Sequence, residues 1–78
     1  MNKNESHVQF ALCLDNEEYE ASLELGKLYR VIADSEAETR GYVRVIDESG
    51  EDYAYSLHRF HLLTLPEPVE QMLLLALP

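Results

Sequence analysis

The segment from Tyr42 to Ser56 constrains the fold most, because it has the pattern of a two-stranded β-hairpin. Two runs rich in β-branched and aromatic residues, 42–47 and 51–56, flank the tripeptide Glu48-Ser49-Gly50. A connection of this length favours a type I turn followed by a glycine in the left-handed region, which forms a bulge. We therefore predict an antiparallel hairpin with Gly50 at positive φ.

The hairpin also carries the most suggestive side chains of the chain. We expect Val43 and Val45 to point to one side of it, with Ala54 across from them. The other side, which we expect to be the outer one, then carries three tyrosines and an arginine: Tyr42, Arg44, Tyr53 and Tyr55. Tyrosine buries a large area while keeping a polar group, so this set suits a protein interface. The alternative is that the rings pack across the strands or lie under the C-terminal helix. Arg44 can pair with Asp52 across the hairpin or stack on a ring.

Three more short strands are predicted by the rest of the chain. Segments 8–14 and 27–33 alternate apolar and polar residues with period two, and segment 61–65 ends at Pro66. A polar loop at 15–22 follows the first strand, and Gly26 can take a positive φ just before the second. Five short strands in about 60 residues indicate a small barrel or two orthogonal sheets.

Two helical turns and one longer helix complete the prediction. Segment 34–41 can hold one turn that Asp34 or Ser35 caps and Gly41 ends. Segment 57–60 lacks alternation and suits a 3₁₀ turn. Residues 66–77 predict a helix whose apolar face consists of Val69, Met72, Leu73, Ala76 and Leu77. Leu74 and Leu75 extend beyond that face, so the helix either packs on the barrel or forms a partner or dimer interface.

The order of these elements resembles that of Src-homology-3 (SH3) domains. Segment 11–15 (Ala-Leu-Cys-Leu-Asp) resembles their Ala-Leu-Tyr-Asp-Tyr opening, and Leu23-x-x-Gly26 resembles the end of their acidic loop. Gly41-Tyr42 falls near their tryptophan pair, and segment 53–56 resembles the stretch before their 3₁₀ turn. The resemblance covers residues 8–65 and implies a mostly β chain, folded as a small five-stranded SH3-like barrel with a short C-terminal helix. Outside the barrel we expect a disordered tail at residues 1–7 and the C-terminal helix at residues 66–78.

The resemblance also bears on function. The chain is similar to a group of short, functionally uncharacterised bacterial proteins that share a stretch like 44–53 and an apolar tail. Eukaryotic SH3 domains grip proline-rich peptides between aromatic residues. Here Cys13 and Asp15 replace two of those aromatics, and the chain contains no tryptophan. Acidic side chains of the equivalent SH3 loop contact a basic ligand residue, which makes three residues candidates for the same role: Glu17, Glu18 and Glu20.

Charge and composition argue against several other functions. The net charge of −9 repels phosphate backbones and anionic lipids. The single cysteine, Cys13, forms no internal disulfide, and the polar N-terminus has no apolar signal segment, so we expect a cytoplasmic protein without a membrane span. His58 and His61 lack the further ligands that a metal site needs, and Cys13 has no neighbouring positive charge to activate it.

We therefore expect a non-catalytic protein-binding module without cofactor or metal, which is a monomer or a dimer through the C-terminal helix. Its candidate binding residues are Tyr42, Arg44, Tyr53, Tyr55, Leu74 and Leu75. The alternative is a nucleic-acid-associated barrel that uses a basic spot formed by Arg30, Arg44 and Arg59. The hairpin tip carries a cluster of acidic residues, Asp47, Glu48, Glu51 and Asp52. We expect these side chains to be solvated in the turn rather than to bind a cation.

Overall fold

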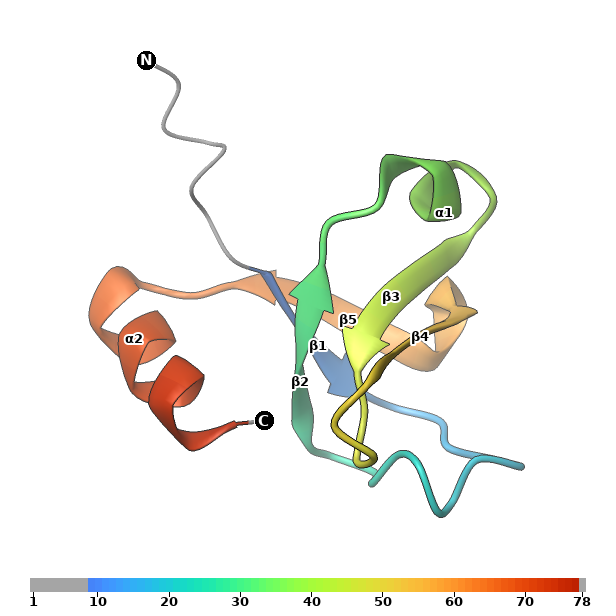
Figure 1. Cartoon of the computed structure of the whole chain (residues 1–78), viewed down its shortest axis with the longest axis horizontal. Helices are drawn as coiled ribbons and strands as arrows, with labels where there is room; N and C mark the ends of the chain where they lie inside the picture. The colour runs from blue at the N-terminus through green and yellow to red at the C-terminus, as the bar shows by residue number, and fades with distance from the viewer. Residues whose placement is uncertain (1–8, 78) are drawn as a thin grey trace.

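The computed structural model describes residues 9–77 and shows a mostly β chain with a short C-terminal helix (Figure 1). The predicted disordered tail at 1–7 lies outside these residues. In chain order the elements are β1 (Gln9–Cys13), β2 (Leu28–Ile32), α1 (Ser35–Thr39), β3 (Tyr42–Ile46), β4 (Asp52–Ser56), η2 (Leu57–Arg59), β5 (Phe60–Thr64) and α2 (Glu67–Ala76). The mostly β class and the terminal helix are thus confirmed, and each strand lies within one residue of its predicted bounds.

The strands form one antiparallel sheet in the order β4-β3-β2-β1-β5. The first half of β2, at 28–30, pairs with β1, whereas its second half, at 31–32, pairs with β3. Because the partner changes along β2, β1 and β5 run across the direction of β3 and β4 (Figure 1). Within the described residues β4 pairs only with β3 and β5 only with β1, so the sheet is open and not a closed barrel.

The core lies against one side of the sheet, which we call the core face. It is built from residues of all five strands together with Leu23 of the loop between β1 and β2. Its buried members are Ala11, Cys13, Leu23, Tyr29, Val31, Val43, Val45, Tyr55 and Phe60. In β1 the smaller residues Ala11 and Cys13 therefore face this core, while Phe10 is fully buried on the opposite, outer face. Leu23 shows that the long loop folds back over the core face.

The hairpin formed by β3 and β4 has the predicted turn. Gly50 has a φ of +86°, and its N–H donates to the carbonyl of Asp47 over 2.9 Å. A glycine takes this left-handed conformation without the steric cost that a β-carbon brings. The prediction of a bulged three-residue connection is therefore confirmed.

The predicted arrangement of side chains on this hairpin is wrong. Val43 lies directly opposite Tyr55, and Val45 lies opposite Tyr53. Directly opposed residues of an antiparallel pair point to the same side, so both tyrosines share the core face with the valines. Tyr42, Arg44 and Ala54 lie on the outer face. The prediction failed because the three-residue turn places odd-numbered residues of β3 opposite odd-numbered residues of β4. Val43 and Val45 therefore face the same side as Tyr53 and Tyr55, and not the side of Ala54.

The helices also differ in part from expectation. In α1, Asp34 is the N-cap, and its carboxylate accepts the N–H of Ala37, as predicted. In α2, Glu70 is the buried side chain, whereas Val69 and Met72 are exposed. The predicted apolar face of this helix is therefore covered only in part. Leu73 and Leu77 of that face are partly covered, as is Leu74 beside it, whereas Val69, Met72 and Ala76 are exposed.

Candidate protein-interaction surface

The first part of the candidate surface is a cluster of tyrosines on the core face at β4. The rings of Tyr53 and Tyr55 lie 4.9 Å apart, and the ring of Tyr19 from the long loop lies 6.5 Å from Tyr53 and 5.0 Å from Tyr55. Tyr55 is buried in the core, but Tyr53 is 51% exposed. Tyr53 is therefore an exposed aromatic residue whose ring lies against those of Tyr19 and Tyr55.

Arg59 of η2 holds the long loop in this position. Its guanidinium lies 4.7 Å from the ring centre of Tyr19, and its Nη1 donates to the carbonyls of Asp15 and Glu17 over 3.3 and 2.9 Å. The Arg59 side chain is only 16% exposed, although its bond to the carbonyl of Glu17 lies at the surface. One arginine thus fixes both the backbone of the loop and the face of Tyr19.

Three exposed carboxylates surround Tyr19 in the chain: Glu17, Glu18 and Glu20. The N–H of Glu17 donates to Asp15, and the N–H of Glu18 donates to Glu20, so the turn is organised by its own acidic side chains. Glu18 adopts a φ of +75°, which is unusual for a residue other than glycine. The result is a negatively charged loop next to the exposed ring of Tyr53.

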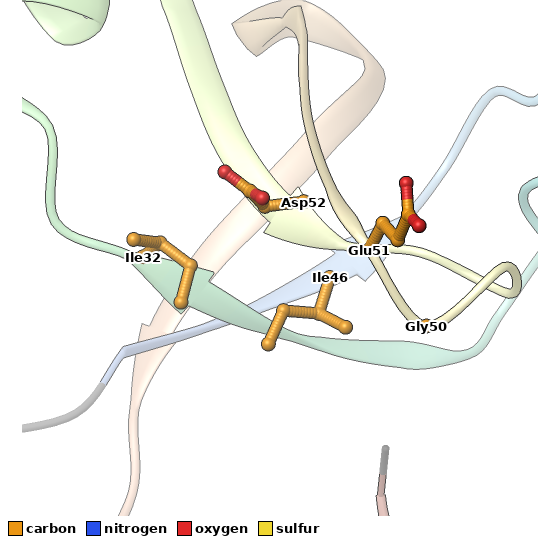
Figure 2. Close-up of a pocket in the computed structure, with 5 residues that line it drawn as sticks. All are labelled: Ile32, Ile46, Gly50, Glu51 and Asp52. Carbon is orange, nitrogen blue, oxygen red and sulfur yellow. The ribbon is translucent and has the colours of Figure 1, made fainter.

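The outer face of the sheet has two surface hollows on either side of Arg44. Figure 2 shows the larger one, of about 460 Å³, where Ile32 and Ile46 lie side by side and Asp52 and Glu51 border them. The smaller hollow, of about 250 Å³, is lined by residues of α1, β3 and β4 and of the turns beside α1: Asp34, Glu36, Ala37, Arg40, Tyr42, Arg44 and Ala54. Both hollows border β4, on the face opposite to Tyr53.

Arg44 is held between these hollows by two carboxylates. Its Nε lies 2.9 Å from Asp34 and its Nη1 lies 3.2 Å from Asp52, so the predicted pairing with Asp52 is confirmed. The bond from the N–H of Ala37 and the bond from Arg44 lower the pKa of Asp34, and the bond to Asp34 raises the pKa of Arg44. Arg44 is thus a bridge between β3, α1 and β4.

The acidic residues of the hairpin tip have structural partners. Asp47 is buried and accepts bonds from the Ser49 N–H, the Ser49 hydroxyl and the Tyr55 hydroxyl over 2.9, 2.6 and 2.7 Å. Burial would raise the pKa of Asp47, but these bonds outweigh it and hold the pKa below its ordinary value. Glu48 accepts bonds from Lys27 and Tyr29, which lower its pKa. Only Glu51 and Asp52 leave their carboxylates largely at the surface.

Among the residues that the structure describes, His58, His61 and Cys13 do not form a common site. Cys13 is buried in the core opposite Phe60, and burial raises the pKa of its thiol. His61 pairs with Leu12 and points to the other face of the sheet, while His58 contacts the hydroxyl of Ser56. Within residues 9–77, no three His, Cys, Asp or Glu side chains are placed to hold a metal ion.

The basic residues considered for nucleic acid are separated or neutralised. Arg30 lies on the outer face of β2, opposite Phe10, whereas Arg59 lies on η2 and is engaged by the long loop. Arg44 bonds two carboxylates. The described part of the chain therefore does not gather these three guanidiniums into one free basic spot.

The two candidate binding residues of α2, Leu74 and Leu75, differ in how far they are exposed. Leu75 is 87% exposed, whereas Leu74 is half-buried. Leu75 joins Val69 and Met72 in an exposed apolar stripe along α2. No helix within residues 9–77 has the length and apolar character that crossing a membrane requires.

Sequence reasoning missed Tyr19, because it lies in an acidic segment without alternation and its role depends on Arg59, 40 positions later in the chain. The signal available was a lone aromatic residue inside a run of carboxylates. Comparisons with protein-family models, with curated proteins and with solved structures found no match for this chain. The surface is therefore interpreted from its own geometry.

Proposed function

We propose that this chain is a non-catalytic protein-interaction module with an SH3-like fold, which binds a basic segment of a partner protein. Two features support the fold proposal. The first is the strand order, which places β5 beside β1. The second is the pair of connections, a long loop between β1 and β2 and a 3₁₀ turn between β4 and β5. Both agree with the SH3 arrangement that the sequence resembles. The bend of the sheet at β2 gives it the curvature that a small barrel needs.

The observation that carries the binding proposal is that an exposed aromatic ring, Tyr53, lies 6.5 Å from the ring of Tyr19, whose neighbours in the loop are exposed carboxylates. Tyr53 offers apolar area and a hydroxyl, and its ring is held by Tyr19 and Tyr55, so little conformational entropy is lost when a ligand contacts it. The loop carrying Glu17, Glu18 and Glu20 supplies negative charge beside it. An aromatic anchor with a polar rim is the usual composition of a protein-binding surface, and here carboxylates supply that polarity.

Charge decides the chemistry of the partner. With a net charge of −9 and an acidic loop that reaches Tyr53 through Tyr19, the surface attracts lysine and arginine side chains and repels acidic ones. Proline-rich ligands are not proposed, because Cys13 is buried in the core, where it replaces one of the groove aromatics of eukaryotic SH3 domains. Nucleic acid is not proposed, because Arg44 and Arg59 are engaged by acceptors of this chain.

The test is a titration of the full chain against a labelled peptide of alternating lysine and valine, followed by fluorescence anisotropy. A peptide of alternating glutamate and valine is the ligand control. We expect binding of the lysine peptide alone, with an affinity that falls as salt is added. Tyr53→Ala is expected to weaken binding about tenfold or more, which corresponds to one significant interface residue.

Two further variants keep the test decisive. Replacing Glu17, Glu18 and Glu20 together by glutamine preserves the hydrogen-bond acceptors of the loop and removes its charge, so binding should weaken while the fold is retained. Leu75→Ala changes an equally accessible apolar residue on α2 and should leave binding unchanged. If Leu75→Ala abolishes binding and Tyr53→Ala does not, the apolar stripe of α2 is the interface and the proposal is wrong.

A further inference from the structure

The outer edge of β4 presents backbone groups that no other strand of the described residues uses. Asp47 donates its N–H to the carbonyl of Glu51, and Leu57 donates its N–H to the carbonyl of Gly41. These two bonds lie at the two ends of the ladder between β3 and β4, and they show which residues of β4 form hydrogen bonds with β3. Because alternate residues of an antiparallel strand bond to the same neighbour, Tyr53 and Tyr55 direct their N–H and C=O groups toward β3.

The intervening residues, Asp52 and Ala54, therefore direct their backbone N–H and C=O groups away from β3. Within residues 9–77, β4 pairs with no strand other than β3, so these groups face outward. The strand contains no proline and no lysine, and its one charged residue, Asp52, disfavours an acidic strand but not a basic one.

This edge lies between the two surfaces described above. On the core face, β4 carries the exposed ring of Tyr53 beside the acidic loop. On the outer face, Asp52 and Ala54 line the two hollows. A strand placed along this edge would point its side chains alternately to the two faces, so it would reach both surfaces at once.

We propose that an extended, basic segment of a partner protein adds to the edge of β4 as a sixth strand of the sheet. The inference rests on the proposed function and specifies how the partner is held. Backbone hydrogen bonds to Asp52 and Ala54 supply affinity, and alternate side chains supply selectivity. Lysine or arginine side chains lie on the side of Tyr53 and the acidic loop, and apolar side chains lie toward the hollow of Ile32 and Ile46.

A second copy of this chain is disfavoured as the occupant of the edge. Each copy carries a net charge of −9, so two copies repel each other as they approach. Glu51 and Asp52 place part of that negative charge at the edge itself. A basic segment gains from the same carboxylates.

The first experiment is amide hydrogen exchange of the wild-type chain, measured by NMR with and without the lysine–valine peptide at saturating concentration. We expect slowed exchange at the amides of Asp52 and Ala54, because these N–H groups gain acceptors only when a strand is added. The amides of Tyr53 and Tyr55 already bond β3 and should change little. Saturating binding without protection at Ala54 would overturn the strand-addition mechanism.

The second experiment compares two substitutions at one position. Ala54→Pro removes the outward N–H, and its nitrogen faces solvent, where an edge strand tolerates proline. Ala54→Val keeps the N–H and adds a β-branched side chain that suits a strand. We expect the proline variant to lose about tenfold or more in peptide affinity. It lacks one interface hydrogen bond, and its ring clashes with the added strand. The valine variant should bind within about threefold of wild type.

The outcomes separate the two proposals. If Tyr53→Ala loses binding while Ala54→Pro retains it, the surface is correct but the partner does not add as a strand. If neither variant changes binding, or if no peptide binds, the proposed function itself fails. The hydrogen-exchange result on the unaltered chain decides the mechanism even where Ala54→Pro does not fold.

Discussion

Replacing Tyr55 with phenylalanine removes one hydroxyl from the core and nothing else. That hydroxyl donates to Asp47 over 2.7 Å, and both side chains are buried, at 3% and 5% exposure. The other oxygen of Asp47 already receives two bonds from Ser49. The variant therefore leaves one oxygen of a buried carboxylate without its donor, at the base of the hairpin turn.

The size of the effect follows from the charge of the acceptor. A hydrogen bond to a charged group contributes about 1.5–3 kcal/mol to stability, and a buried unsatisfied acceptor costs a similar amount. A domain of this length has a total stability of roughly 4–12 kcal/mol. With a urea dependence of about 1 kcal/mol per molar, the unfolding midpoint should fall by about 1.5–3 M.

The effect should also depend on pH in a defined direction. The pKa of folded Asp47 lies below its ordinary value of 3.8, so its carboxylate stabilises the fold at any pH above that value. This contribution is lost as the pH falls through the lower, folded pKa. The difference between wild type and Tyr55→Phe should be constant from pH 7 to about 5 and shrink at acid pH, where a neutral bond contributes only about 0.5–1.5 kcal/mol.

Urea unfolding followed by circular dichroism measures both quantities. Tyr53→Phe is the matched control, since Tyr53 is on the same strand and face, and its hydroxyl makes no hydrogen bond within the described residues. We expect that control to change stability by less than about 0.5 kcal/mol. Equal and small effects of the two substitutions would refute the assignment of Tyr55 and Asp47 as a buried, stabilising pair.

Three other substitutions test the local structure. Gly50→Ala meets no neighbouring atom but forces a β-carbon into the left-handed region, so it should cost about 1–2 kcal/mol in urea unfolding. Arg59→Lys loses the stacked, multiply bonded guanidinium and should cost about 1–2 kcal/mol while increasing proteolysis of the loop around Tyr19; unchanged proteolysis would contradict the clamp. Asp34→Asn keeps an oxygen for the N–H of Ala37 and loses only the charge, so its thermal midpoint should lie between those of wild type and Asp34→Ala. A midpoint equal to that of Asp34→Ala would show that the ion pair with Arg44, and not the cap, accounts for the effect.

Local signals in the sequence predicted most of the secondary structure. The turn at Gly50, the cap at Asp34 and the 3₁₀ turn at Leu57 each depend on one or two neighbouring residues, and each is present. The strand bounds follow from alternation and from Pro66. These features are fixed by short-range sterics and hydrogen bonding, which a sequence expresses directly.

The errors concern which side of an element faces the core. In β1 the alternation separates Phe10 and Leu12 from Ala11 and Cys13 without saying which pair faces the core, and the buried cluster uses Ala11 and Cys13 together with rings from β4 and β5. In α2 the apolar residues outnumber the available buried positions, so their pattern does not indicate an orientation. Packing partners far away in the chain decide both cases.

The candidate surface was predicted only in part. Tyr42 and Tyr53 are exposed as expected, but they lie on opposite faces, and Tyr55 is a core residue. Tyr19, the clamp by Arg59 and the free edge of β4 depend on contacts between residues that are distant in sequence. Whether the sheet closes into a barrel depends on the pairing of its two edges, which alternation within single strands does not encode.

The most direct test of the account is to map where a basic peptide binds, using amide chemical shifts of the isotope-labelled chain. The lysine–valine peptide should shift the amides of Tyr53 and Ala54 most, followed by those of Glu18 and Glu20 in the acidic loop. The exposed stripe of α2 at Val69–Leu75 should change little. Shifts confined to α2, with Tyr53 and Ala54 unaffected at saturation, would contradict the claim that this chain binds its partner at β4.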